Sequence, residues 1–111
     1  KATEELLDLP NPPTCIMYPD DYAAVGGMNE IRERGLRIPE DISITGYDGI
    51  DLVRMMEPKL TTLCQDTRKI GRMAAEKLIS LIEHPKTTLV DKFSVDGVLF
   101  KGGSVGRNRE C

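Results

Sequence analysis

The sequence has little of what identifies several large classes of protein. Its 111 residues include no tryptophan and a single histidine, His84. No apolar stretch reaches the roughly 18 residues that a membrane-spanning helix needs, so we expect no membrane segment. The three cysteines, Cys15, Cys64 and Cys111, form neither a CxxC pair nor a cluster with histidine. This pattern predicts no metal site, and unpaired cysteines favour the reducing cytoplasm over an oxidising compartment.

A continuous stripe of positive charge is also missing. The formal net charge is −3, and the arginines between residues 32 and 54 alternate with acidic side chains. A nucleic-acid-binding module usually carries a basic patch on one face. We therefore do not expect this segment itself to contact DNA.

The residue groups on which most enzymes depend are absent as well. There is no plausible nucleophile–base pair and no phosphate-binding glycine loop, and residues 46–49 (GYDG) are not a dinucleotide fingerprint. His84 precedes a proline at a predicted helix end, where a charge or cap role is expected. Asp20 and Asp48 could face one another for acid–base work, but nothing else supports catalysis. We expect no enzyme and no cofactor.

What is present is an alternation of strand-like and helix-like segments. We expect helices over residues 2–9, 19–35, 51–56 and 67–83, and strands over 14–18, 42–47, 60–64 and 93–100. This order predicts an α/β fold with a parallel sheet. The nearly continuous apolar run in 14–18 is typical of a strand that is buried on both faces.

Polar residues follow three of the predicted strands, where ligands bind in open α/β sheets. They are Asp20 and Asp21 after the first strand, Tyr47 and Asp48 at the end of the second, and Asp66 after the third. Carboxylates can accept two neighbouring hydroxyl groups, and tyrosine offers a sugar ring an apolar face. The alternatives are that the first and last carboxylates cap helices and that Asp48 and Gly49 form a plain turn.

Three segments are similar to segments of LacI/GalR transcription regulators. Residues 13–27 (PTCIMYPDDYAAVGG) resemble the family's PTAI and AND-x-x-A-x-G motifs, and residues 34–48 (RGLRIPEDISITGYD) resemble its RGLRVPEDISVVGYD segment. Residues 58–62 (PKLTT), followed by Gln65, Gly71, Ala74 and Leu78, resemble PPLTT…Q…G…A…L. The three segments occur in the family's order and extend over about residues 13 to 83.

The resemblance implies a parallel-sheet, type I periplasmic-binding-protein-like effector domain, here its C-terminal subdomain plus a crossover helix. Residues 1–12 would end a preceding helix and linker, and 13–66 would form the C-terminal effector-binding subdomain. Residues 67–101 would be the crossover helix and returning strand, and 102–111 a frayed tail. The family's DNA-binding domain precedes all of this and would be absent from the chain, which could not form the complete cleft alone.

The resemblance also implies which side chains contact the effector. Asp20 falls where the family has the asparagine of its AND motif, and Asp48 is the carboxylate after GY. Departures at Tyr18, Pro19 and Gly49 leave the effector's identity open. The predicted ligand-binding residues are Asp20, Asp21, Tyr22, Tyr47, Asp48, Asp66 and Thr67.

By the same resemblance, the chain would form a homodimer. The residues that map to the family's interface are Val25, Met28, Met55 and Met56, and the alternative is that they belong to the chain's own core.

The function that follows is sensing of a small effector, a sugar or sugar derivative, by a cytoplasmic repressor. That repressor would bind operator DNA through a domain outside this chain. The alternative is a periplasmic sugar-binding protein of an ABC-type transporter, to which the GYDG segment is also similar. Induction versus corepression and the target genes stay open.

Overall fold

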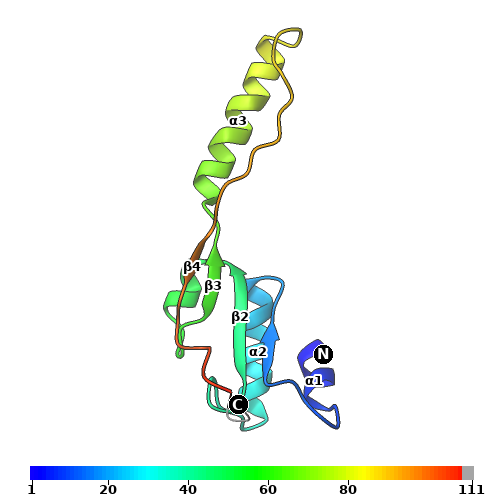
Figure 1. The fold of residues 1–111 in the computed structure, drawn as a ribbon, viewed down its shortest axis with the longest axis vertical. Coiled ribbons are helices and arrows are strands. Elements are labelled where there is room, and N and C mark those ends of the chain that lie inside the picture. Colours follow the sequence, from blue (N-terminus) through cyan, green and yellow to red (C-terminus); the bar gives the residue numbers. More distant parts are fainter. Residues whose placement is uncertain (109–111) are drawn as a thin grey trace. The chain divides into compact units, whose positions relative to one another are not determined.

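The computed structural model describes residues 1–108, which form two compact units (Figure 1). The first unit contains residues 1–64 together with the segment that starts at Val98, and the second contains Gln65–Gly97. Cys111 and the last part of the predicted tail lie outside the described residues.

A four-stranded sheet organises the first unit. Its strands are β1 (Cys15–Met17), β2 (Ser43–Asp48), β3 (Thr61–Cys64) and β4 (Val98–Phe100), in that order across the sheet (Figure 1). The first three strands are parallel, and β4 runs antiparallel to β3. The predicted α/β class with a mainly parallel sheet is confirmed. The last strand is shorter than predicted, because residues 93–97 are not part of it.

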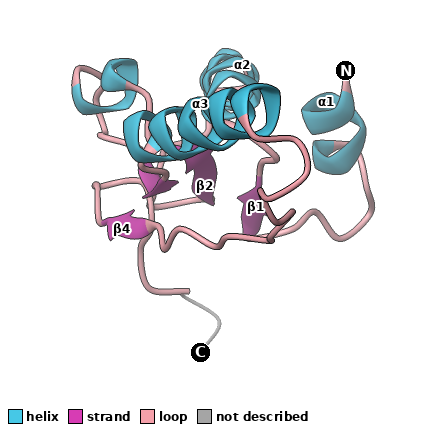
Figure 2. Ribbon diagram, turned by 90° about the horizontal axis from the view of Figure 1, so that it is seen from above, coloured by secondary structure: helices cyan, strands magenta, loops and turns pink. Residues whose placement is uncertain are grey.

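One helix, α2 (Asp21–Glu33), packs on β2 and covers one side of this sheet (Figure 2). Its buried residues are Asp21, Ala24, Gly27, Met28 and Ile31. This stripe has the spacing of a helix face. It includes the small residues Ala24 and Gly27, which let the helix approach its neighbours closely. The remaining helices of the unit are α1 (Ala2–Leu7) and the 3₁₀ helix η1 (Asp51–Arg54).

The apolar core lies between α2 and the sheet. Ile16 and Ile44 come from the strands, and Met28 and Ile31 come from α2. Leu60, which directly precedes β3, completes the set. Ile44 and Leu60 have no exposed surface. Burial of side chains of this size stabilises the fold by roughly 1.5–3 kcal/mol each.

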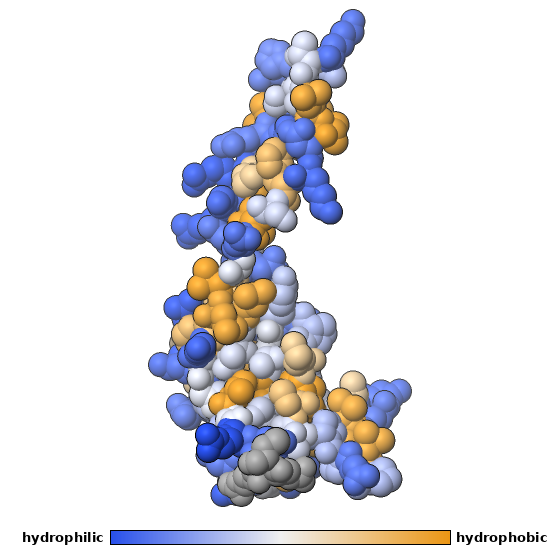
Figure 3. Space-filling model, viewed as in Figure 1, coloured by the Kyte–Doolittle hydropathy of each residue, from blue (hydrophilic) through white to orange (hydrophobic). Residues whose placement is uncertain are grey.

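The opposite face of the sheet is partly open. Cys15 and Met17 alternate with the buried Ile16, and Met17 is 82% exposed. The expectation that β1 is buried on both faces is therefore wrong. The helices of this unit lie on the side of the sheet that α2 covers (Figure 2). Apolar side chains are visible on the surface of the molecule (Figure 3).

The segment after β4 is bound to the sheet, so the expected fraying does not apply to residues 102–106. Ser104 is fully buried: its hydroxyl donates to Ile44 O at 2.7 Å and accepts from Thr61 N at 2.8 Å. Gly103 N–H donates to Lys59 O at 2.7 Å. The hydroxyl of Ser104 thus connects β2 and β3. The glycine-rich composition of the tail alone does not indicate this role.

The second unit consists of α3 (Thr67–Glu83) and the chain that returns along it. The bounds of α3 are those that the sequence predicted. Its apolar side chains line a hollow of about 550 Å³ with Phe93 and Val95. Lys77 Nζ donates to Leu89 O at 3.0 Å and to Asp91 at 3.1 Å. No residue of α3 is buried, so this unit has only a thin core of its own.

The four predicted dimer residues differ in exposure. Met28 has no exposed surface, Met56 is half-buried against the core, and Val25 is half-buried. Met55 is 83% exposed. The structure favours the core alternative for Met28 and leaves Met55 available to a partner.

Met28 and Met55 form a matched pair for testing which of these side chains belongs to the core. Met28→Ala should lower the free energy of unfolding by about 2–5 kcal/mol, because it opens a cavity in the core. Met55→Ala should change it by less than about 0.5 kcal/mol, because little contact is lost. Urea unfolding of the chain followed by circular dichroism measures both. Equal effects of the two substitutions would contradict the packing described here.

Candidate functional site

The carboxyl ends of the parallel strands share one edge of the sheet. β1 ends at Met17, which pairs with Thr45, whereas β2 continues to Asp48, which pairs with Cys64 at the end of β3. After β1, Tyr18 N–H still donates to Thr45 O at 2.9 Å. The turn at Pro19 then starts α2, so its first residues lie beside the end of β2.

Asp20 is the N-cap of α2. Its backbone is extended, with φ −153° and ψ 169°, and its Oδ1 accepts the Ala23 N–H at 2.7 Å. A capping carboxylate satisfies one of the free amides of the first turn and lies at the positive end of the helix dipole. The side chain is half-buried. The cap alternative therefore applies to Asp20, and one of its oxygens is already engaged.

Asp21, the next residue, is placed quite differently. It is 0% exposed, and its two oxygens accept three hydrogen bonds from distant parts of the chain. Oδ2 accepts from Gly49 N at 2.7 Å and from Ile50 N at 2.9 Å, and Oδ1 accepts from Thr62 Oγ1 at 2.6 Å. This placement favours a supporting role for Asp21 over direct contact with a ligand.

The turn after β2 has an unusual backbone. Asp48 has φ +107° and Gly49 has φ +76°. Positive φ is costly for a residue with a Cβ and is found mainly where the surroundings enforce it, often at functional sites. A Cβ on Gly49 would overlap Cys64 Sγ and lie 2.6 Å from Cys64 Cα. Glycine is thus required for the turn to lie this close to the end of β3.

The tyrosines near this edge have different surroundings. Tyr22 and Tyr47 are exposed. Tyr18 is half-buried, and its hydroxyl lies 2.8 Å from Thr3 Oγ1. Burial raises the pKa of the Tyr18 phenol, and the hydrogen bond with Thr3 lowers it by less. Tyr18 fills the space beside Gly27, where a Cβ would overlap its ring. Two tyrosines thus remain free to offer a ring to a ligand.

Asp66 and Thr67 belong to the second unit. Asp66 is the N-cap of α3, because its Oδ1 accepts the Lys69 N–H at 2.9 Å. Thr67 is the first helical residue, and both side chains are exposed. As with Asp20, the cap alternative accounts for one oxygen of the carboxylate.

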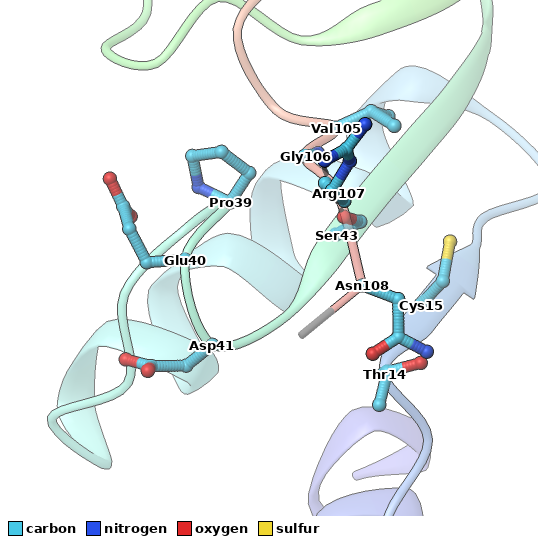
Figure 4. Close-up of a pocket in the computed structure, with 10 residues that line it drawn as sticks. All are labelled: Thr14, Cys15, Pro39, Glu40, Asp41, Ser43, Val105, Gly106, Arg107 and Asn108. Atoms are coloured by element: carbon cyan, nitrogen blue, oxygen red, sulfur yellow. Dashed lines mark hydrogen bonds between the residues drawn. The ribbon is translucent and has the colours of Figure 1, made fainter. Parts of the chain in front are cut away.

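A hollow of about 310 Å³ lies at the other end of the strands, bounded by the turn at Pro39, the start of β1 and the tail (Figure 4). None of the predicted ligand residues lines it. Two of its polar side chains are engaged: Asp41 accepts from Arg37 N and Nε at 2.8 and 2.9 Å, and Ser43 Oγ accepts from Gly106 N at 3.1 Å. We interpret it as a seam between the tail and the sheet.

Sequence reasoning missed two residues inside β2 and β3 that contribute to this site. Thr62 supplies the hydroxyl that binds Asp21, and a Cβ on Gly46 would overlap Asp21 Oδ1. The available signal was a threonine inside a buried strand and a glycine directly before Tyr47 and Asp48. Among residues 1–108 there is no cluster of three metal-ligating side chains, and no helix is long and apolar enough to cross a membrane.

Comparisons with known proteins agree on one family. The model for a periplasmic binding protein-like domain matches residues 1–105. The chain is 45% identical over 87 residues to the "Probable HTH-type transcriptional repressor ExuR" of Bacillus subtilis (strain 168), covering 78% of this chain and 26% of that protein. It is 42% identical over 83 residues to the HTH-type transcriptional repressor CytR of Escherichia coli (strain K12), covering 75% and 24%.

The same likeness extends to solved structures. A LacI family transcriptional regulator from Enterococcus faecium with bound ribose superimposes with a TM-score of 0.83 and 34% identity, covering 93% of this chain and 37% of that one. The chain spans about a quarter of the length of the curated relatives it matches.

The cap at Asp20 makes a stability prediction. Asp20→Ala should lower the free energy of unfolding by about 0.5–2 kcal/mol, because the Ala23 amide loses its acceptor. Asp20→Asn should keep most of the stability, because its side-chain oxygen can accept the same hydrogen bond. Urea unfolding of the two variants beside the unchanged chain measures this. A loss in Asp20→Asn as large as in Asp20→Ala would show that the cap is not the source.

Proposed function

The chain belongs to the periplasmic binding protein-like domain family, as the C-terminal part of a LacI-type effector-binding domain, and on this premise we propose that it is the effector-sensing part of a transcriptional repressor. The observation that carries the proposal is Asp48, a carboxylate held at positive φ on the carboxyl edge of a parallel sheet. This edge is where α/β folds bind ligands. The named relatives are repressors, which favours a regulator over a transporter's binding protein and over an enzyme.

The effector we propose is a sugar or sugar derivative. A matched regulator holds ribose, and the chemistry at this edge suits a polyol. A carboxylate accepts hydrogen bonds from neighbouring hydroxyls, and an exposed tyrosine offers an apolar ring face with a polar tip. Asp48, Asp20, Tyr22 and Tyr47 are the proposed contacts from the first unit.

The other predicted ligand residues have different support. Asp66 and Thr67 remain proposed effector contacts on the resemblance alone. Asp21 is proposed to act through its neighbours, because its oxygens already accept three hydrogen bonds. Binding would favour one of two conformations of the complete protein and so change its affinity for DNA.

We place the protein in the cytoplasm as a homodimer that binds operator DNA through a domain outside this chain. Cys15 and Cys64 are free thiols, and Cys15 is exposed, which suits a reducing compartment. Met55 with Val25 and Met56 is the proposed dimer surface, because Met55 exposes most of its apolar side chain.

A thermal-shift screen with D-ribose and other sugars on the complete protein tests the function, since a ligand that binds the folded state raises its melting temperature. A sugar that stabilises the wild type should bind Asp48→Ala roughly ten- to a hundredfold more weakly, the effect of losing a hydrogen bond to a charged group. Asp51→Ala is the control, because Asp51 is an exposed carboxylate close by with the same charge.

Two outcomes would contradict the proposal. No shift with any sugar, for a protein that unfolds cooperatively, would argue against sugar sensing. Equal losses in Asp48→Ala and Asp51→Ala would show that net charge, and not a contact at the strand end, determines the affinity.

A further inference from the structure

Asp21 is connected to three segments that are far apart in the sequence. Its Oδ2 accepts the N–H groups of Gly49 and Ile50, and its Oδ1 accepts the hydroxyl of Thr62, all within 2.9 Å. The side chain itself sits at the first position of α2 and has no exposed surface. It therefore links the start of α2, the loop of residues 48–50 and strand β3.

The loop of residues 48–50, called the effector loop below, depends on this carboxylate. Asp48 and Gly49 both have positive φ, a conformation that an L residue such as Asp48 rarely adopts unless other contacts enforce it. The two amides that Asp21 accepts follow Asp48 directly. Their hydrogen bonds to a carboxylate are of the strong, charge-assisted type. They can therefore hold the backbone in this conformation.

Two glycines, Gly46 and Gly49, leave the space that this arrangement needs. A Cβ on Gly46 would overlap Asp21 Oδ1, and a Cβ on Gly49 would overlap Cys64 Sγ. The loop is thus pressed between Asp21 on one side and the end of β3 on the other. The lack of side chains at these two glycines is what lets the carboxylate and the loop approach each other.

From this geometry we infer that Asp21 is a positioning residue of the effector site: it fixes the effector loop so that Asp48 faces the ligand, and it does not touch the ligand. The inference rests on the proposed function for the role of Asp48. The hydrogen-bond network itself is independent of any ligand. Thr62 completes it by donating to the other oxygen, Oδ1, which connects Asp21 to β3.

Amide hydrogen exchange followed by NMR on the complete protein, without any sugar, tests the network. In Asp21→Ala the amides of Gly49 and Ile50 should exchange at least about tenfold faster, because their acceptor is gone. Asp21→Asn should retain most of the protection, since its carbonyl can accept both amides while its NH₂ group faces Thr62. Thr62→Val should have a smaller effect, because Oδ2 remains available.

Two other amides are built-in controls. The Ala23 amide donates to Asp20, and the Ile44 amide donates to Ser104 O. Both should be unchanged in Asp21→Ala, whereas Asp20→Ala should expose Ala23 and leave Gly49 and Ile50 protected. If Ile44 also loses protection in Asp21→Ala, the fold itself has loosened. Thr62→Val and Asp21→Asn, which keep an acceptor for both amides, then decide whether residue 21 holds the loop. Unchanged exchange at Gly49 and Ile50 in a folded Asp21→Ala overturns the inference.

Calorimetric titration with D-ribose, or with whichever sugar stabilises the wild type, tests the positioning. Affinity should fall about tenfold or more in Asp21→Ala, and Asp21→Asn should restore most of it. Binding that is lost in Asp48→Ala but unchanged in Asp21→Ala would overturn the positioning role. If no sugar binds the wild type, the proposed function fails, and the exchange of Gly49 and Ile50 still decides whether Asp21 holds the loop.

Discussion

The buried carboxylate of Asp21 is the constraint around which the carboxyl end of the sheet is arranged. A charged group without contact with water is strongly unfavourable unless hydrogen bonds replace its hydration. Here two backbone amides and one hydroxyl do so, and the position in the first turn of α2 adds the favourable end of the helix dipole. Because the three donors come from separate segments, α2, the effector loop and β3 must keep their relative positions for the charge to be tolerated.

Much of this fold could be predicted from the sequence, because proline, glycine and apolar runs mark its elements clearly. α3 begins and ends where its capping aspartate and its apolar spacing indicate. The carboxylates at the strand ends were also predictable as a group. The individual role of each carboxylate could not be predicted. Asp20 and Asp21 are adjacent and chemically identical, but Asp20 has an extended backbone and Asp21 is the first helical residue. Only the strands packed against α2 decide that one caps and the other is buried.

The predictions that failed concern which surface a residue faces. The apolar run of β1 indicated burial on both faces, but Met17 is exposed, since a pattern records that a residue is apolar and not that a partner covers it. On α2, Ala24 and Gly27 belong to the buried stripe, although small residues add little to an apolar pattern. The close approach they allow, with Tyr18 against Gly27, depends on residues outside the helix. Ser104 was missed for the same reason.

A loop held in this way has a consequence for how binding energy is used. An uncommon backbone conformation such as that of Asp48 costs about 1–3 kcal/mol, and the hydrogen bonds from Gly49 and Ile50 to Asp21 offset that cost before any ligand arrives. Binding then need not order the loop, which is the usual loss when a flexible site closes. An effector changes a conformational equilibrium only by the difference in its affinity for the two states. In the sensor proposed here, Asp48 would favour the state that holds the loop in this preformed conformation, because only that state binds without the cost of ordering the loop.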